Sequence, residues 1–566
     1  MESFSHRAFL SLLAPAMVTA GWGQHSVWAQ TDVFEWDDVD NVVAFADVHG
    51  ADRELRTLLR ESGVIDDRQR WTAGHAHVVS LGDLLDRGAA SREVLDLLMR
   101  LQEEAAAAGG RLHVLLGNHE AMNLLGDLRY VDPREYAAYV DLESVADRER
   151  ARSADRCGEA CAPFDERFPP GYFGRRAAFA PDGRYGSWLL RLPVAIRIDD
   201  TLYTHGGLGS ALVGMTLREV NEGYRTALSE TVTGTRTVNE QPLLSSDGPN
   251  WYRGDALCHE VSESDVLLPL LRQFGAERLV IGHTPTRNSR AVTRFDGRVV
   301  KLDTGMNAAA YDGRPAALIS SRGSDARVLY AGETSSAPPE PEGFVVAPQQ
   351  LGDAFVVDAL RVGAIAVTAP RSGDAIEVSV THDGRSVPAL FRVLGADDVR
   401  REVAAFRLDR LLELGVVPAT VERQFQNRSG VLQARPRHWV TETQRREQPS
   451  KSGGWCALEP QLQILYVVDA LAGNEQRTAG SILYDSDDWF IYATSFGRSF
   501  GRGRELPGYL RARPPAPGTE MRRRLAMLDE PGLAAALGEL LDARERSAIL
   551  ARRDAVLALP SAGATR

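Results

Sequence analysis

The sequence has almost no lysine, fewer basic than acidic residues and no long apolar run in its interior, and the last two shortages each exclude a class of protein. Only two of the 566 residues are lysines, Lys301 and Lys451, and the formal net charge at pH 7 is −12. This acidic balance gives no indication of nucleic-acid or anionic-membrane binding. Beyond Gly21 no segment approaches the roughly 18 apolar residues of a membrane-spanning helix, so we expect no membrane association of the mature form.

The N-terminus has the pattern of an export signal. Ala8–Gly21 is apolar, has the length of a signal-peptide core and is too short to span a membrane comfortably. The triplet Val27-Trp28-Ala29 places small residues where a signal peptidase reads them, which predicts cleavage before Gln30. We therefore interpret residues 1–29 as a signal peptide and expect a periplasmic or secreted protein. A buried core helix is the alternative interpretation of this segment.

Cysteine is scarce, and the four residues allow three complete pairings. Cys157 and Cys161 lie four positions apart in a polar stretch. Because an exported protein meets oxidising conditions, a local disulfide between them is favoured over free thiols. A zinc site at these two cysteines is disfavoured, since no His or Cys pair stands beside them at ligand spacing.

Five short strings carry the chemistry of this chain. They are DVHG at Asp47–Gly50, GDLLDRG at Gly82–Gly88, GNHE at Gly117–Glu120, HGG at His205–Gly207 and GHT at Gly282–Thr284. Together they supply oxygen and imidazole donors, the set that holds paired cations for the hydrolysis of phosphate esters. These donors are Asp47, His49, Asp83, Asn118, His119, His205 and His283.

Each string follows a short apolar run rich in β-branched residues, which predicts a buried strand that ends in a loop. The runs are Val42–Ala46, His77–Leu81, Leu112–Leu116, Thr201–Thr204 and Arg278–Ile281. Helical patterns at Asp52–Ser62 and Ser91–Ala108 fill the first gaps, so the order is that of an α/β fold with ligand residues at the carboxyl ends of strands. One string alone could be an ordinary turn, but five in this order predict a metal site.

The strings resemble the pattern GDxHG, GDxxDRG, GNHE, HGG and GH of calcineurin-like metallophosphoesterases of the phosphoprotein phosphatase type. Within that superfamily the chain is most similar to the Shewanella-like protein phosphatases, on the stretches Ala121–Val131, Phe168–Leu190 and Trp251–Gly254. Ala46 stands where the family usually has Gly, a difference small enough to be tolerated. The resemblance implies a β-sandwich with flanking helices over residues 34–332.

The resemblance also implies two metal ions, of Mn, Fe or Zn, that share one water molecule and make it a nucleophile at neutral pH. Asp83 would bridge the two ions, because one carboxylate has an oxygen for each. The remaining ligands would be Asp47 and His49 for the first ion, and Asn118, His205 and His283 for the second.

Three further roles follow from the same resemblance. Arg87 and Arg253 would hold the phosphoryl oxygens, since a guanidinium fits phosphate with two parallel hydrogen bonds. His119 would protonate the leaving oxygen, with Asp86 holding its other nitrogen and raising its pKa. The plainer interpretations, a surface salt bridge for Arg87 and a helix cap for Asp86, are disfavoured inside a DRG motif.

These assignments predict a phosphoprotein phosphatase that hydrolyses phosphomonoesters in phosphorylated proteins or small phosphoesters. A dinucleoside-polyphosphate hydrolase shares GDxxDRG and GNHE, but the long insert after GNHE argues against it. A non-catalytic sensor of phosphorylated ligands is a third interpretation, and the intact ligand set argues against that one.

A second domain is predicted over residues 344–566, after the proline-rich acidic stretch Glu333–Gly343, which we expect to be an unpacked linker. Phe355–Ala369, Ala375–Thr381 and Pro388–Val393 have the composition of strands, and Val399–Gly415 that of a helix. In order and spacing the region resembles the α+β fold of HipA-like atypical kinases. An unrelated α/β domain is the alternative.

The residues at the kinase positions argue against kinase activity. Arg392 replaces the strand lysine, and Glu402 keeps the helix acid. Gln476, Ser481 and Ser495 stand where the catalytic Asp and two metal ligands belong, and phosphoryl transfer needs such groups. We predict a pseudokinase that binds a protein partner or packs on the phosphatase. If the alignment with the kinase pattern is shifted by one residue, Glu475 instead of Gln476 stands at the position of the catalytic base.

Overall fold

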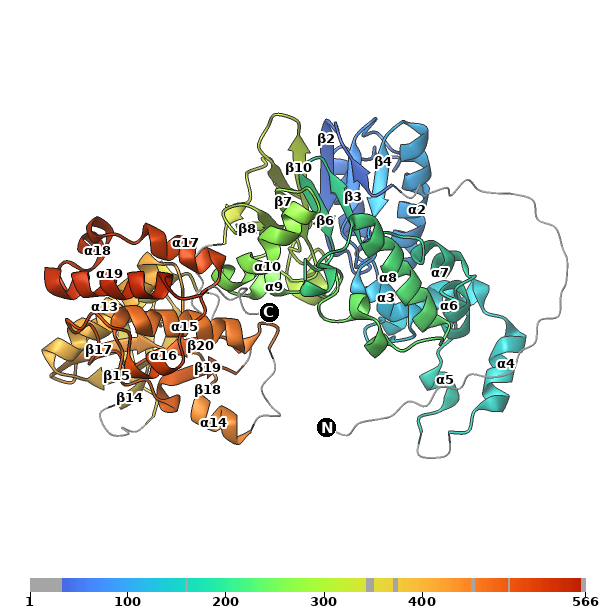
Figure 1. Cartoon of the computed structure of the whole chain (residues 1–566). Coiled ribbons are helices and arrows are strands. Elements are labelled where there is room, and N and C mark those ends of the chain that lie inside the picture. Colours follow the sequence, from blue (N-terminus) through green and yellow to red (C-terminus); the bar gives the residue numbers. More distant parts are fainter. Residues whose placement is uncertain are drawn as a thin grey trace. The chain divides into compact units, whose positions relative to one another are not determined.

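The structure is a computed structural model that describes residues 33–157, 161–342, 351–369, 375–448, 454–486 and 489–560 (Figure 1). The predicted signal peptide lies outside the described residues. The chain from Phe34 onward packs as one unit. None of the described helices combines the length and apolarity needed to cross a membrane.

Two β-sheets occupy the first part of the chain (Figure 1). One has the strand order β11-β10-β2-β3-β4, and the other the order β1-β5-β6-β7-β9-β8-β12. The strands are β1 (Glu35–Trp36), β2 (Asn41–Phe45), β3 (His77–Ser80), β4 (Arg111–Val114), β5 (Ala195–Ile198), β6 (Thr201–Thr204), β7 (Arg278–Ile281), β8 (Val292–Arg294), β9 (Val299–Lys301), β10 (Ala316–Ser321), β11 (Arg327–Tyr330) and β12 (Glu340–Pro341). Strands β2, β3 and β4 run parallel, as do β6, β7 and β9.

The two sheets share a core to which both contribute aliphatic side chains, among them Val79 and Leu318 from one sheet and Val280 and Val300 from the other. Helices cover the sheets; α2, for example, packs on β4 (Figure 1). All four residues of β3 are buried, which is why its sequence does not alternate between apolar and polar positions. The predicted β-sandwich with flanking helices is confirmed.

The helices of this part lie between the strands in the chain. They are α1 (Asp52–Glu61), α2 (Ser91–Ala107), α3 (Asn118–Leu124), α4 (Val145–Ala154), α5 (Phe164–Arg167), α6 (Tyr172–Ala178), α7 (Arg184–Leu189), α8 (Leu217–Val232), α9 (Gly254–Leu257), α10 (Glu260–Gln273) and α11 (Ala308–Tyr311). Short 3₁₀ helices add Pro133–Leu142, Ser210–Leu212, Val238–Glu240 and Pro242–Leu244.

The later part of the chain contains an antiparallel sheet of order β13-β14-β15-β17-β16 and a smaller one of order β18-β19-β20, with helices packed on them. The strands are β13 (Ala364–Val367), β14 (Ala375–His382), β15 (Arg385–Val393), β16 (Thr420–Phe425), β17 (Arg428–Ala434), β18 (Trp439–Thr441), β19 (Ile482–Asp485) and β20 (Ile491–Ala493). The helices are α12 (Asp353–Val362), α13 (Ala396–Leu411), α14 (Glu442–Glu447), α15 (Leu458–Ala472), α16 (Gly508–Ala512), α17 (Thr519–Met527), α18 (Glu530–Leu537) and α19 (Ala543–Leu557), with a 3₁₀ turn at Ala479–Ser481.

Two expectations for this region were wrong in part. The first half of the predicted strand Phe355–Ala369 belongs to helix α12, whose buried residues Val356, Ala359 and Leu360 have helical spacing, while Ala364–Val367 is strand β13 as expected. Within the stretch expected to stay unpacked, Glu340 and Pro341 form strand β12, which pairs with β8 at the edge of the larger sheet. Pro341 is tolerated there because an edge strand leaves one row of N–H groups unpaired. Beyond it, Glu342 pairs with the buried ammonium of Lys301 at 2.9 Å.

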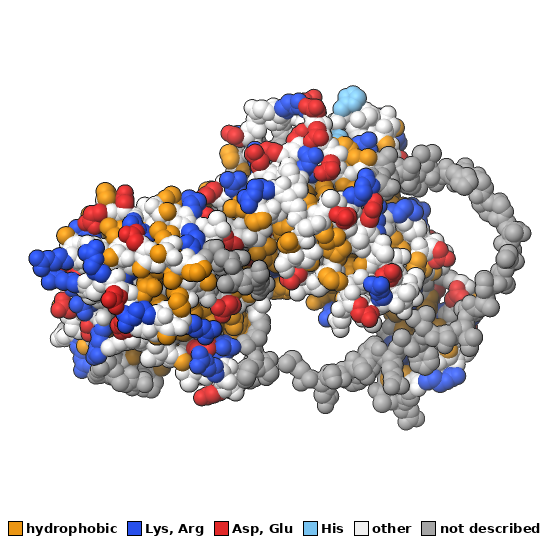
Figure 2. Space-filling model, viewed as in Figure 1, with side chains coloured by type: hydrophobic (Ala, Val, Ile, Leu, Met, Phe, Trp, Pro, Cys, Tyr) orange, Lys and Arg blue, Asp and Glu red, His pale blue; other side chains and the backbone are white. Residues whose placement is uncertain are grey.

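Charges of both signs are interspersed over the visible face of the molecule (Figure 2). This mixture agrees with a chain whose net charge is modest for its length.

Candidate active site

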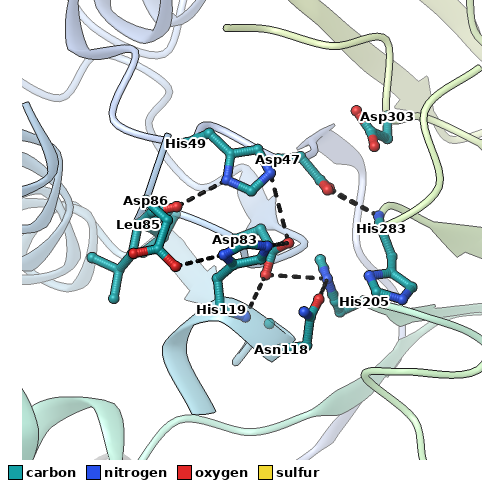
Figure 3. Close-up of polar contacts among 12 residues, drawn as sticks. Asp47, His49, Asp83, Leu85, Asp86, Asn118, His119, His205, His283 and Asp303 are labelled. Carbon is teal, nitrogen blue, oxygen red and sulfur yellow. Dashed lines mark hydrogen bonds and ion pairs between the residues drawn. The ribbon is translucent and has the colours of Figure 1, made fainter. Parts of the chain in front are cut away.

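The five predicted strings meet at one place, at the carboxyl ends of β2, β3 and β4 from one sheet and of β6 and β7 from the other (Figure 3). Each string therefore contributes from a rigid strand end, as the sequence predicts. The seven donor residues are all 5% exposed or less: Asp47, His49, Asp83, Asn118, His119, His205 and His283.

Asp83 lies at the centre of the cluster. One carboxylate oxygen is 3.2 Å from Nε2 of His205, and the other is 3.8 Å from Nε2 of both His49 and His119 (Figure 3). Two groups of possible metal ligands result, one of Asp83 with His49 and His119, the other of Asp83 with His205 and His283, each with ligand atoms within 4.8 Å. Asp83 belongs to both groups, which is the placement expected of a bridging carboxylate.

The remaining predicted ligands border these groups. Asn118 places its side-chain oxygen 2.9 Å from Nε2 of His205. The carboxylate of Asp47 accepts the backbone N–H of His283 at 3.0 Å, and Nε2 of His283 is buried without a hydrogen-bond partner. A buried ring nitrogen with no partner is an atom left available for a ligand.

Backbone carbonyls orient two of the imidazoles. Nδ1 of His49 donates to the carbonyl of Leu85 at 2.8 Å, and Nδ1 of His205 donates to that of Leu81 at 2.9 Å. A carbonyl can only accept, so these bonds fix the proton on Nδ1 and turn Nε2 of each ring toward Asp83. Outer hydrogen bonds of this kind are typical of histidines that bind metals.

The electrostatics of the cluster favour a bound cation. Burial raises the pKa of Asp47 well above its usual value, and repulsion from Asp303 and Asp83 raises it further. Burial would also raise the pKa of Asp83, but the surrounding imidazoles hold it well below its usual value. Burial lowers the pKa of His49 to about 4, so this ring is neutral and can act as a ligand. Carboxylates crowded together with neutral imidazoles fit the oxygen and nitrogen sites that Mn²⁺, Fe²⁺ and Zn²⁺ accept.

The loops of the site are held in unusual backbone conformations. His49, Asp83, Asp86, Arg87 and His283 all have φ between 47° and 70°, a region that costs non-glycine residues about 1–3 kcal/mol each. Such outliers cluster at functional sites because the surrounding fold enforces them.

Two glycines of the motifs are required by close approach. A Cβ at Gly117 would lie 2.3 Å from Oδ1 of Asp83, and one at Gly282 would lie 2.4 Å from Oδ1 of Asp47. The motifs GNHE and GHT therefore begin with glycine for steric reasons.

His119 and Asp86 form the pair that the resemblance implies. Nδ1 of His119 is 2.6 Å from Oδ2 of Asp86, whose other oxygen accepts from the amide of Asn123 at 3.0 Å. Burial lowers the pKa of His119, but the carboxylates of Asp83 and Asp86 outweigh this effect and raise it above its usual value. The ring therefore holds a proton more readily than a free histidine does.

The two arginines are placed differently. The guanidinium of Arg87 is exposed and lies over the rings of Tyr130 and Tyr311, at 4.7 and 5.3 Å from their centroids. Nη1 of Arg253 donates to the carbonyl of His283 at 2.9 Å and to the hydroxyl of Thr284 at 2.8 Å. Its Nε is buried and has no hydrogen-bond partner. Arg253 is thereby fixed beside the loop that carries His283, and its Nε–H donor has no partner.

Sequence reasoning did not assign a role to three residues that the structure brings to the site. Glu120 accepts the backbone N–H groups of Asp83 and Leu84, each at 2.8 Å, and so fixes the loop that carries Asp83. Asp303 lies in the sequence Asp-Thr-Gly just after strand β9, so it follows a strand end as the five strings do. The same criterion applied to β9 would have identified it. The hydroxyl of Tyr311 lies 3.1 Å from Nε2 of His49, a contact for which the sequence gives no signal.

The cysteines form two disulfides. Cys157 is joined to Cys161, and Cys258 to Cys456. The first is the local pairing that the sequence favours. The second, which the sequence did not assign, links the end of α9 to the later part of the chain across 198 positions.

Comparisons with known proteins agree with this geometry. Residues 41–287 match the model of the family described as calcineurin-like phosphoesterase. Shewanella-like protein phosphatase 1 of Plasmodium berghei is 25% identical over 295 residues, which cover 51% of this chain and 73% of the relative. An uncharacterized protein of Schizosaccharomyces pombe is 31% identical over 303 residues, covering 52% of this chain and 81% of the relative.

Among solved structures, a cold-active protein-tyrosine phosphatase of a psychrophilic Shewanella species is 29% identical, with a TM-score of 0.42, and the match covers 54% of this chain and 82% of the other. The fold and site define a phosphoester hydrolase. The chain belongs to the calcineurin-like phosphoesterases, a family that uses divalent metal ions.

Proposed function

We propose that this protein is a two-metal phosphoprotein phosphatase that hydrolyses phosphomonoesters. The observation that carries the proposal is the single carboxylate of Asp83 shared by two groups of possible metal ligands. The name of the Plasmodium relative, a protein phosphatase, supports a phosphorylated protein as substrate.

Asp83 would bridge the two ions, with the other ligands those that the sequence predicts: Asp47, His49, Asn118, His205 and His283. When bound, two such ions of Mn, Fe or Zn polarise the phosphoryl oxygens and acidify a water molecule.

The remaining residues bind the phosphoryl group and move a proton. Arg253 offers its free Nε, and Arg87 its exposed guanidinium, to the phosphoryl oxygens. His119 delivers a proton to the leaving oxygen, because Asp86 keeps that ring oriented and protonated.

A side-by-side turnover assay tests the proposal. Purified protein is given a phosphotyrosine peptide, a phosphoserine peptide and diadenosine tetraphosphate, with and without a chelator. We expect turnover of at least one phosphopeptide, its loss on chelation and its recovery with Mn²⁺. Turnover of diadenosine tetraphosphate alone would identify a dinucleoside-polyphosphate hydrolase. If the protein binds metal but turns over none of the three substrates, it would be a non-catalytic sensor of phosphorylated ligands.

We also propose export, with a mature chain that begins near Gln30. Two disulfides support this, since such bonds persist in oxidising compartments. N-terminal sequencing of protein recovered outside the cytoplasm checks it, and Glu2 retained on cytoplasmic protein would contradict it.

A further inference from the structure

An aromatic ring from the later part of the chain lies against the proposed phosphate-binding arginine. The ring of Trp455 has its centroid 5.0 Å from Cζ of Arg253, within the range of a cation–π contact. Trp455 remains 49% exposed, so a large part of its indole is open to a bound molecule.

The backbone beside this ring is held by a covalent bond. Cys456, the next residue, is joined to Cys258, with the two Cα atoms 5.3 Å apart. Arg253 and Cys258 cap the two ends of α9, so Trp455 and Cys456 contact both ends of one short helix. Both cysteines are buried, at 6% and 5% exposure.

Further contacts support this attachment. The ring of His259 packs edge-on against Phe490 at 5.3 Å. The carboxylate of Asp265, on α10, accepts the backbone N–H of Thr519 at 2.8 Å, at the start of α17. The part of the chain that carries Arg253 is therefore held against the later part by contacts besides the disulfide, and the disulfide is the bond next to Trp455.

Arg253 can hold a phosphoryl group and the indole at once. A guanidinium donates hydrogen bonds in its plane and stacks through its face. Nη1 is occupied by His283 and Thr284, Nε has no partner, and Cζ lies over the ring of Trp455. A phosphoryl oxygen bound at the edge of Arg253 would place the rest of the ester beside the exposed indole.

We propose that Trp455 is a specificity-determining residue that packs against the leaving group and favours aryl phosphate monoesters, of which phosphotyrosine is one. The proposal rests on the phosphate-binding role of Arg253 given above. Two aromatic rings in contact attract each other by more than the area they bury would give. An alkyl leaving group, such as the serine of phosphoserine, does not provide this extra attraction.

Substitution of the ring in the full-length protein tests the proposal. With Trp455→Ala, we expect KM for a phosphotyrosine peptide and for p-nitrophenyl phosphate to rise about 3–10-fold, the size of an aromatic pair contact. KM for a phosphoserine peptide of matched sequence should change less than about 2-fold, and kcat on each substrate should hold. Trp455→Phe keeps a ring and should restore most of the aryl preference.

Inhibition by inorganic phosphate separates this role from that of Arg253. Phosphate has no leaving group, so its inhibition constant should be unchanged in Trp455→Ala and weakened in Arg253→Lys. Equal rises in KM on both peptides, or no rise on either, would overturn the role of Trp455. If the wild type turns over none of these esters, the proposed phosphatase function fails instead, which is a distinct result.

The disulfide offers a second test with a matched control. Cys258→Ser with Cys456→Ser should reduce the aryl preference toward that of Trp455→Ala, because the indole loses its covalent anchor. Cys157→Ser with Cys161→Ser removes a bond of the same kind elsewhere and should leave the preference intact. A full aryl preference in the first variant, with the disulfide present by peptide mapping in the wild type, would show that the bond does not position Trp455.

Discussion

Two buried carboxylates, Asp83 in the phosphatase site and Asp469 in the later part of the chain, are surrounded in opposite ways. Asp83 faces three imidazoles and lies in the same cluster as Asp47 and Asp303. Asp469 accepts two hydrogen bonds at 2.7 Å from the guanidinium of Arg477, and others from Tyr509 and Asn474.

The difference indicates which region needs a ligand. A cation bound among the acids of the phosphatase site would relieve the repulsion between them. Asp469 is already neutralised by a guanidinium, which also donates to Ser481 and to the carbonyl of Thr494. Charges that are paired within the fold support a structural role for this part, and support the prediction of a pseudokinase.

The largest expected effect is at the shared carboxylate. Asp83→Asn should abolish hydrolysis and reduce bound metal below two equivalents, because an amide offers only one good ligand atom and no charge. Elemental analysis and p-nitrophenyl phosphate turnover measure this. Two tightly held ions in the variant would contradict bridging, and Asp469→Asn is the control that should keep both.

The next effect separates acid catalysis from metal binding. His119→Asn should retain metal and lose about 10²–10⁴ in rate on alkyl phosphates, the usual contribution of a general acid. Aryl phosphates leave more easily and should lose less. Losses of equal size on both kinds of ester would rule out the assignment.

In the later part of the chain we expect an effect on stability instead. Asp469→Ala leaves the buried guanidinium of Arg477 unpaired, which should lower the free energy of unfolding by about 3–5 kcal/mol. Denaturant titration measures it, and the double variant with Arg477→Leu should recover part of the loss. Unchanged stability would mean that the ion pair of Asp469 and Arg477 does not stabilise the fold.

No phosphoryl transfer is expected from the same region. Incubation of the full-length protein with radiolabelled ATP should label neither the chain nor a generic protein acceptor, since Gln476, Ser481 and Ser495 replace the groups that such transfer needs. Metal-dependent labelling that disappears in Glu475→Gln would show an active kinase with a shifted register.

The smallest effect concerns acid stability of the phosphatase sheets. Burial lowers the pKa of His77 to about 4 and that of its neighbour His113 well below the usual value. The unfolded chain then binds more protons below pH 6.5, so stability is present above that pH and is lost as pH falls toward 4. Thermal melts of His113→Gln should show a shallower loss over this window than the wild type, by up to about 1.4 kcal/mol per pH unit.

The sequence by itself determined the fold of the first part and most of its site. Each motif is a strand end followed by residues whose spacing is local, and parallel strands bring such ends together whatever the rest of the chain does. That is why the sequence alone placed Asp83 and His205 in one cluster. Asp303 follows a strand end in the same way, so it could have been assigned to this cluster from the sequence too.

Only the tertiary structure decided the contacts between distant segments. The helix α12 was hidden because a short apolar run fits strand or helix equally well until a packing partner selects one. The bond from Cys258 to Cys456 and the position of Trp455 on Arg253 join segments about 200 positions apart. No periodicity or motif in the sequence predicts such a contact between distant segments, because it depends on how two folded surfaces fit together.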